Sequence, residues 1–195
     1  MKRVLITGFE PFGGQKINPS WESVKALGDL IGENQVYKMQ LPTVYGKAAK
    51  AVIERAEQIK AEIVICVGQA GGRAYVSPEV IGINLRDCSL ADNEGNLIQN
   101  QAIICDAPAA YFSTLPIRQM VKNINDYGIE SKLSYSAGAF VCNDVLYSLL
   151  HHFNGTQVRV GFIHLPFLPC QVSEGTFSMP LEKMIKALEI AILSL

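Results

Sequence analysis

The chain has 195 residues, of which 49% are hydrophobic and 18% are charged, and its formal net charge is -1. This length suits one compact domain with a sizeable core, so we expect residues 1–195 to form a single domain. There is no basic excess to neutralise a phosphate backbone, which argues against a nucleic-acid partner. Neither an 18-residue apolar stretch nor a basic amphipathic segment is present, which argues against a membrane partner.

The cysteines and the N-terminus point to a reducing compartment. Five cysteines, an odd number, occur without any Cys-x-x-Cys pair. This disfavours a disulfide framework and a structural zinc site. The apolar run at residues 4–8 is too short for the core of a signal peptide, and Glu10 soon follows. We therefore expect a cytoplasmic protein.

The first third of the chain alternates extended and helical patterns. Asn18 and Pro19 are typical of a helix start, as cap and first-turn residue. Residues 62–67 are almost continuously apolar, which favours a central parallel strand covered on both faces. The expected elements are a strand at 4–9, a helix at 18–31, a strand at 36–41, a helix at 45–60 and a strand at 62–67.

The remaining chain first loses and then regains this alternation. Turn residues at 92–96 separate two extended segments, 80–85 and 97–104, and indicate a small antiparallel excursion. After them we expect a helix at 117–128, a strand at 132–136, a helix at 142–153, a strand at 158–164 and a helix at 180–192. The pattern predicts an α/β fold, a single-domain α/β/α sandwich with a mixed, mostly parallel twisted sheet.

Cys142 falls where a predicted strand gives way to a helix, in a run of small residues at 136–139. Ligands of open α/β sheets bind outside the carboxyl ends of the strands. Free N–H groups in the first turn of a helix stabilise an anion, so we expect a lowered thiol pKa and support for an oxyanion. From position alone, a small space-filling side chain is an equally good interpretation of Cys142.

His164 is one of three histidines, and it ends an apolar strand just before Pro166. His151 and His152 lie near the end of a predicted helix, where attraction to the helix dipole accounts for them. A lone histidine at a strand end is more often structural. Its occurrence beside a cysteine at another strand end favours a Cys–His pair, in which the imidazole activates the thiol.

Glu79 and a glycine-rich segment complete the candidate positions. A glutamate after Ser77-Pro78 can orient a histidine, although alone it is more often an exposed loop carboxylate. Asp92 and Asp144 compete for the same role. Residues 68–73, GQAGGR, match neither the dinucleotide fingerprint nor the phosphate loop, and a tight turn is an equally good interpretation.

Taken together, six motifs resemble the pyroglutamyl peptidase I (pyrrolidone-carboxylate peptidase) family of cysteine peptidases. They run through nearly the whole chain: GFEPFGG at 8–14, NPSWE at 18–22, LPTV at 41–44, CVGQAGGR at 66–73, SAGAFVCN at 136–143 and GFIHLP at 161–166. The resemblance implies hydrolysis of N-terminally pyroglutamylated peptides by Cys142 as nucleophile, His164 as base and Glu79 as the group that holds the histidine. It also implies no metal or organic cofactor, and a homo-oligomer, tetramer or dimer. The implied substrate positions are Phe9, Phe12, Gln69, Phe140 and Val141.

An uncharged lining suits this substrate, because pyroglutamate is a neutral, flat lactam without a free α-amine. Phe9 and Phe12 are expected to sandwich the ring, with Gln69 or backbone groups on its polar edge. Core packing is the competing interpretation of these phenylalanines, and for Phe140 it is equally good.

The sequence departs from the family at two places. Val80-Ile81-Gly82 follows the glutamate in place of Arg-Val-Ala, and Cys88-Ser89-Leu90-Ala91 stands before Asp92-Asn93, where an Ala-Arg pair is usual. These departures support one alternative, a catalytically weakened binding protein on the same fold that recognises a small neutral amide. A second alternative is a nucleotide-processing enzyme that uses the glycine-rich segment.

Overall fold

A six-stranded sheet forms the centre of the molecule in the computed structural model, which describes residues 1–195. The strand order is β2-β3-β1-β4-β8-β5. Four strands are parallel: β1 (Lys2–Phe9), β3 (Asn34–Leu41), β4 (Ile63–Gln69) and β8 (Arg159–Leu165). At the edges, β2 (Leu30–Ile31) and β5 (Ser77–Pro78) run antiparallel to their neighbours. The prediction of a mixed, mostly parallel sheet is confirmed.

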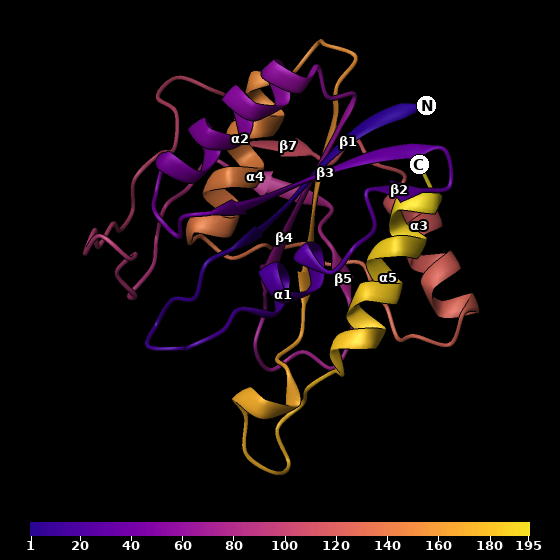
Figure 1. The fold of residues 1–195 in the computed structure, drawn as a ribbon. Helices are drawn as coiled ribbons and strands as arrows, with labels where there is room; N and C mark the ends of the chain where they lie inside the picture. The colour runs from indigo at the N-terminus through magenta and orange to yellow at the C-terminus, as the bar shows by residue number, and fades with distance from the viewer.

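Helices cover both faces of this sheet and make three layers (Figure 1). On one face lie α1 (Pro19–Lys25), α3 (Ile117–Asp126) and α5 (Leu181–Leu193). On the other lie α2 (Lys47–Ile59) and α4 (Val141–His152). A short 3-10 helix, η1 (Pro169–Gln171), interrupts the loop between β8 and α5. The α/β sandwich expected from the sequence is therefore observed.

Alternate side chains of the central strand β4 belong to two separate apolar cores, one on each face of the sheet. Ile63, Ile65 and Val67 pack with α1, α3 and α5, whereas Val64 and Cys66 pack with α2 and α4. All five side chains are at most 1% exposed. Burying each of the aliphatic ones contributes about 1.5–3 kcal/mol, which explains why this segment is continuously apolar, as expected for a strand covered on both faces.

Helix α1 is shorter than predicted. It ends at Lys25, and residues 30–31 belong to β2, which turns through Gly32 and Glu33 into β3. Gly32 has a φ of +58°, a left-handed conformation that glycine adopts without strain. Leu27 and Ile31 still belong to the core on the α1, α3 and α5 side of the sheet, so the apolar spacing extends beyond the end of the helix.

The antiparallel excursion is present, but with a different partner from the one predicted. β6 (Ile81–Ile83) pairs with β7 (Ala110–Phe112), and residues 97–104 form no strand, although Gln101 makes one antiparallel bridge with Arg86. The side chain of Asn84 accepts hydrogen bonds from the backbone N–H groups of Ile103 and Ile104, at 2.8 and 2.9 Å. These bonds take the place of a strand ladder, as Asn side chains often do in turns.

The strand predicted at 132–136 is also absent as a regular element. This segment does run beside residues 76–80, with the hydrogen bonds Lys132 N to Val76 O and Ser134 N to Pro78 O, both of 3.0 Å. The ladder is interrupted because Pro78 has no N–H to donate. Two isolated bridges therefore remain, Val76 to Ser131 and Glu79 to Ser134.

Candidate active site

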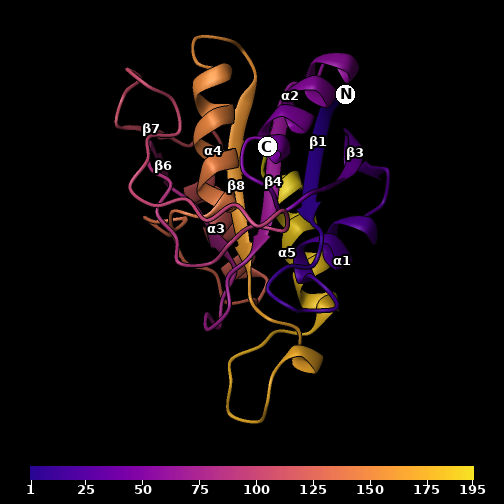
Figure 2. The same ribbon diagram turned by 90° about the vertical axis from the view of Figure 1, so that its left-hand side faces the viewer.

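Cys142 and His164 meet at the carboxyl end of the parallel strands. Residues of β8 alternate between the two faces, and His164 shares the α4 side with Val160 and Phe162. Helix α4 lies alongside β8 and begins at the level where that strand ends (Figure 2). Cys142 is the second residue of this helix. The fold thus brings the two predicted strand-end residues to one face and one end of the sheet.

Gly68 is the point at which the two side chains converge. It pairs with His164 across the β4–β8 ladder. A Cβ atom added to Gly68 would lie only 3.0 Å from Cys142 Sγ and 2.7 Å from the ring of Phe162. The sulfur therefore lies over Gly68 of β4, and His164 is the paired residue of the neighbouring strand β8, about 4.8 Å away. Only glycine leaves room for the thiol there.

Glu79 contacts the imidazole from the edge of the sheet. Its Oε1 lies 2.7 Å from His164 Nδ1 and 3.0 Å from Arg73 Nη1. The Glu79 side chain is fully buried and that of His164 is 5% exposed. Burial raises the pKa of Glu79, but the hydrogen bond and charge of His164, with the Ser134 hydroxyl and Arg73, outweigh it and hold the pKa below its usual range. An ionised Glu79 can only accept, so His164 Nδ1 carries a proton and donates this hydrogen bond.

The other candidate carboxylates bind elsewhere. Asp144 accepts hydrogen bonds from Arg86 Nε at 2.7 Å and from the Gly46 N–H at 2.8 Å. Asp92 accepts from the Tyr45 N–H at 3.0 Å and from the loop that follows it. Of the three carboxylates considered from the sequence, Glu79 is the one in contact with His164.

The thiol differs from the sequence-based expectation. Burial raises the pKa of Cys142 to about 12, and the nearby charge of Glu79 adds to the increase, while Arg73 opposes it. These contacts favour a neutral thiol over a thiolate stabilised by the helix. A nucleophile at this position needs a base that removes its proton during the reaction.

The first turn of α4 supplies unpaired backbone donors beside the sulfur. Phe140 occupies the N-cap position with an extended backbone, and no side chain caps the helix. The first backbone hydrogen bond of the turn runs from Asp144 N to Phe140 O, at 3.1 Å. The N–H groups of the three preceding residues, including that of Cys142, have no hydrogen-bond partner in another residue. Donors placed in this way stabilise an oxyanion that forms next to the sulfur.

Side chains within the same turn fix its position. Asn143 donates to the carbonyl groups of Ile83 and Leu85 and accepts from the Ile83 N–H, each at 2.9 Å. Asp144 and Arg86 form an ion pair with a shortest distance of 2.6 Å, and the Asp144 side chain is fully buried. Our sequence reasoning did not find Asn143, Arg86 or Arg73, because their roles depend on loops that the fold brings together.

Comparisons with known proteins agree with this geometry. The pyroglutamyl peptidase family profile matches residues 2–195. The pyrrolidone-carboxylate peptidases of Bacillus thuringiensis and Yersinia pestis are 44% and 46% identical over 197 residues, which cover 98% of this chain and 92% of each relative. The chain belongs to the pyroglutamyl peptidase family.

Solved structures of the family share the fold. The pyroglutamyl peptidase I of Bacillus amyloliquefaciens superposes with a TM-score of 0.96 at 42% identity, covering 99% of this chain and 94% of that one. A mutant pyrrolidone carboxyl peptidase of Pyrococcus furiosus gives 0.94 at 42% identity, covering 98% and 97%. Family membership favours the peptidase interpretation over a nucleotide-processing enzyme.

The residues implied as substrate contacts are divided by the structure. Phe12 and Phe140 are half-buried near the start of α4, with ring centroids 5.9 Å apart, and Tyr45 meets Phe140 edge-on at 5.4 Å. Phe9 and Val141 are at most 2% exposed and belong to the core between the sheet and α2 and α4. Phe12 and Phe140 are thus the rings that have exposed surface for a ligand.

Gln69 directs its side chain away from this face. In β4 it shares the side of Ile65 and Val67, and its Oε1 accepts a hydrogen bond from Gln171 Nε2 at 2.9 Å. Gln171 is itself fixed, because its Oε1 accepts from the Leu168 N–H and its Nε2 also donates to the Ile17 carbonyl. Any contribution of Gln69 to a pocket beside Cys142 comes from its backbone.

Two further observations bear on the expected partners. No cluster of three or more His, Cys, Asp or Glu side chains has the arrangement needed to hold a metal ion. None of the helices combines the length and the apolar character needed to cross a membrane.

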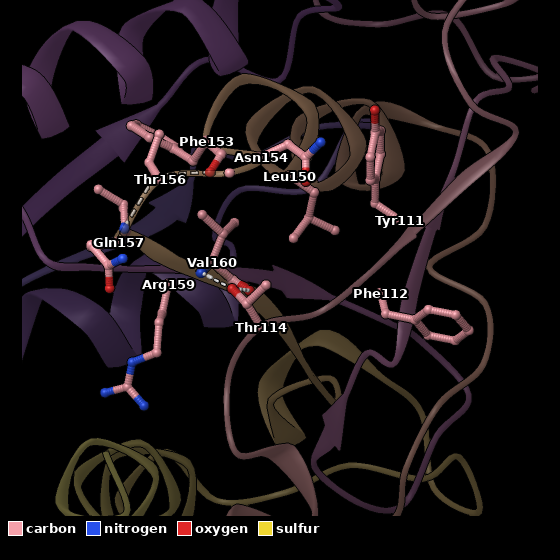
Figure 3. Close-up of a pocket in the computed structure, with 12 residues that line it drawn as sticks. Tyr111, Phe112, Thr114, Leu150, Phe153, Asn154, Thr156, Gln157, Arg159 and Val160 are labelled. Atoms are coloured by element: carbon pink, nitrogen blue, oxygen red, sulfur yellow. Dashed lines mark hydrogen bonds between the residues drawn. The ribbon is translucent and has the colours of Figure 1, made fainter.

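A surface cavity of about 330 Å³ lies at the opposite end of β8 from His164 (Figure 3). It is lined by the end of β7, the end of α4 with the loop that follows it, and the start of β8, among them Phe112, Phe153 and Arg159. The candidate catalytic side chains do not line it.

Proposed function

We propose that this protein hydrolyses the amide bond after an N-terminal pyroglutamyl residue through a thioacyl-enzyme formed on Cys142. The contact between His164 Nδ1 and Glu79 Oε1, on the face of the sheet that holds the Cys142 sulfur, supports this proposal most directly. An ionised Glu79 accepts a hydrogen bond from Nδ1–H, so the neutral imidazole keeps an unprotonated Nε2. That nitrogen is the base that a neutral thiol requires.

The reaction then follows from the positions of these groups. His164 Nε2 takes the proton of Cys142 as Sγ attacks the pyroglutamyl carbonyl carbon. The free N–H groups of the first turn of α4 stabilise the oxyanion. His164 returns the proton to the departing amine, and water, activated by the same nitrogen, releases pyroglutamate and restores the thiol. Glu79 keeps the imidazole in one tautomer and stabilises its charged form.

An uncharged site explains the preference for a blocked N-terminus. Phe12 and Phe140 offer aromatic surface near the sulfur, and no carboxylate other than Glu79, which is buried behind His164, contacts the catalytic pair. An aminopeptidase for ordinary peptides needs an anion that binds the free ammonium group. The lactam carries no charge, so aromatic rings and backbone groups suffice to bind it.

Turnover of a pyroglutamyl-coumarin amide, beside its prolyl and glutamyl analogues, tests the proposal. We expect activity on the pyroglutamyl compound alone, and a loss of at least about 10³-fold in Cys142→Ser, because removing the nucleophile of such a unit removes most of the rate. Cys105→Ser, at an exposed cysteine, is the matched control. Undiminished turnover in Cys142→Ser would reject the nucleophile, and absence of turnover in the unmodified protein would favour the binding-protein alternative.

Several finer expectations stay predictions. These are a single domain over residues 1–195, a homo-oligomer (tetramer or dimer), a cytoplasmic location, and no binding to nucleic acid or membranes. Size-exclusion chromatography with light scattering measures the oligomeric state. A monomeric mass would contradict the expected homo-oligomer.

A further inference from the structure

We propose that Arg73 is a positioning residue, whose guanidinium holds the Glu79–His164 pair in place and links it to the segment that leads to Cys142. The inference rests on the proposed function and assigns a role to one more residue of the same site. Its basis is a fork of two hydrogen bonds that join three separate parts of the chain.

The fork is defined by its two ends. Arg73 Nη1 donates to Glu79 Oε1 at 3.0 Å, and Nη2 donates to the Ser136 carbonyl at 3.2 Å. Ser136 lies six residues before Cys142 in the loop that ends at α4. The planar guanidinium therefore sets the distance between the carboxylate and the loop that leads to the nucleophile, a task that suits arginine because its donors are held in a rigid geometry.

The carboxylate has few other partners. Glu79 Oε1 receives both His164 Nδ1 and Arg73 Nη1, while Oε2 is buried and has no hydrogen-bond partner. The Glu79 side chain is fully buried, whereas Arg73 is 26% exposed. A buried carboxylate without a compensating charge is strongly unfavourable. When His164 is neutral, Arg73 is the cation that compensates Glu79.

The charged and titratable groups around Glu79 give Arg73 a second effect. They are His164 from β8, Arg73 from the glycine-rich loop and Cys142 from α4, with the neutral Ser134 hydroxyl beside them. The Glu79 charge raises the pKa of Cys142, and the Arg73 charge lowers it. Arg73 therefore stabilises the ionised form of Glu79. It also counteracts the increase that the Glu79 charge causes in the pKa of Cys142.

Arg73→Met keeps the length of the side chain and removes its charge and donors. We expect kcat for the pyroglutamyl-coumarin amide to fall about 10- to 100-fold, as is typical for groups that orient a catalytic side chain, with KM little changed. The acid limb of kcat/KM is expected to move to higher pH, because Glu79 gains a proton more easily. Arg73→Lys restores the charge without the fork, so part of the rate returns. Arg159→Met, at the other end of β8, is the control.

A double-mutant cycle with Glu79→Gln decides whether Arg73 acts through the carboxylate. In that background we expect Arg73→Met to change kcat by less than about threefold. Equal losses in both backgrounds, or an unshifted acid limb in Arg73→Met, would overturn the inference while leaving the peptidase function intact. Absence of turnover in the unmodified protein would instead defeat the proposed function.

The reactivity of the Cys142 thiol tests the role of Arg73 without any turnover of substrate. Alkylation of Cys142 by iodoacetamide, followed by mass spectrometry, is expected to require a higher pH in Arg73→Met than in the unmodified protein. Circular dichroism checks that each variant is folded, and Arg73→Lys serves if the methionine variant does not fold. Identical pH curves for alkylation in the unmodified protein and in a folded variant would overturn the inference.

Discussion

The two ends of β8 differ in what they offer a ligand. At its start, the strand borders a surface cavity whose lining includes only one charged side chain, Arg159 (Figure 3). Near its end, His164 contacts a buried carboxylate and lies beside a glycine that makes room for a thiol. The two ends are roughly 16 Å apart, at 3.3 Å per residue. The comparison teaches that a hollow on the surface is a poorer guide to function than side chains able to exchange protons.

The largest effect is expected from Glu79→Gln, which tests the chemistry assigned to the His164 end. The amide can donate to Nδ1 and so favour the wrong tautomer, as when an asparagine replaces the aspartate of a serine-protease triad. We expect kcat to fall by about 10²- to 10⁴-fold, measured with the pyroglutamyl-coumarin amide.

Glu130→Gln provides the control, because it is an exposed glutamate on the segment that runs beside residues 76–80. We expect it to retain the activity of the unmodified protein. Full activity in Glu79→Gln would show that the carboxylate does not support the imidazole.

A pair of glycines provides a matched test of geometry at the two ends. In Gly68→Ala the new methyl group would meet Cys142 Sγ and Phe162, and we expect kcat/KM to fall about 10- to 100-fold, because displacements of about 1 Å at reacting groups have effects of this size. In Gly161→Ala it would meet Leu115 and Ser113, near the start of β8. This variant should lose stability in urea denaturation and, where folded, keep its kcat/KM. Equal losses of kcat/KM in both variants would mean that crowding, not contact with the thiol, reduces the activity.

A smaller effect is expected on stability against acid. The pKa of folded Glu79 lies below its ordinary value of 4.5. A carboxylate of this kind stabilises the fold fully above the unfolded pKa, and this contribution is lost as the pH falls through the folded pKa. The urea midpoint of the unmodified protein should therefore fall more between pH 7 and pH 4 than that of Glu79→Gln. An equal fall in both proteins would mean that Glu79 is not ionised by its native contacts.

Much of this architecture follows from local patterns in the sequence. The apolar run of β8 placed His164 at a strand end, where parallel sheets bind ligands, and the small-residue junction before α4 placed Cys142 at a helix start. Alternation along β4 already separates Gly68 from Gln69, and it carries the side chain of Gln69 to the face opposite Cys142. Period-two reasoning at that position therefore limits Gln69 to a contact through its backbone and leaves its role in substrate binding a prediction.

Other features required the three-dimensional structure. The ladder beside residues 76–80 is interrupted because Pro78 lies in it, and its partner segment has no strong pattern of its own. Arg73 reaches Glu79 and Ser136 only because three loops meet at one edge of the sheet. The raised pKa of Cys142 comes from burial, which position at a helix start does not reveal. These are tertiary effects, and no local propensity encodes them.

The smallest effect is expected from Phe112→Ala, which tests the cavity end. Phe112 lines the cavity and is 70% exposed, and its ring points away from the other residues that line it (Figure 3). An exposed side chain of this kind has little packing to lose, so we expect the free energy of unfolding to change by no more than about 0.5 kcal/mol. Turnover of the pyroglutamyl-coumarin amide should stay within about twofold, since nothing in the cavity contacts the catalytic side chains. A tenfold loss of kcat/KM in a stable Phe112→Ala would show that the amino end of β8 takes part in binding or catalysis. The cavity could then no longer be separated from the catalytic end of the strand.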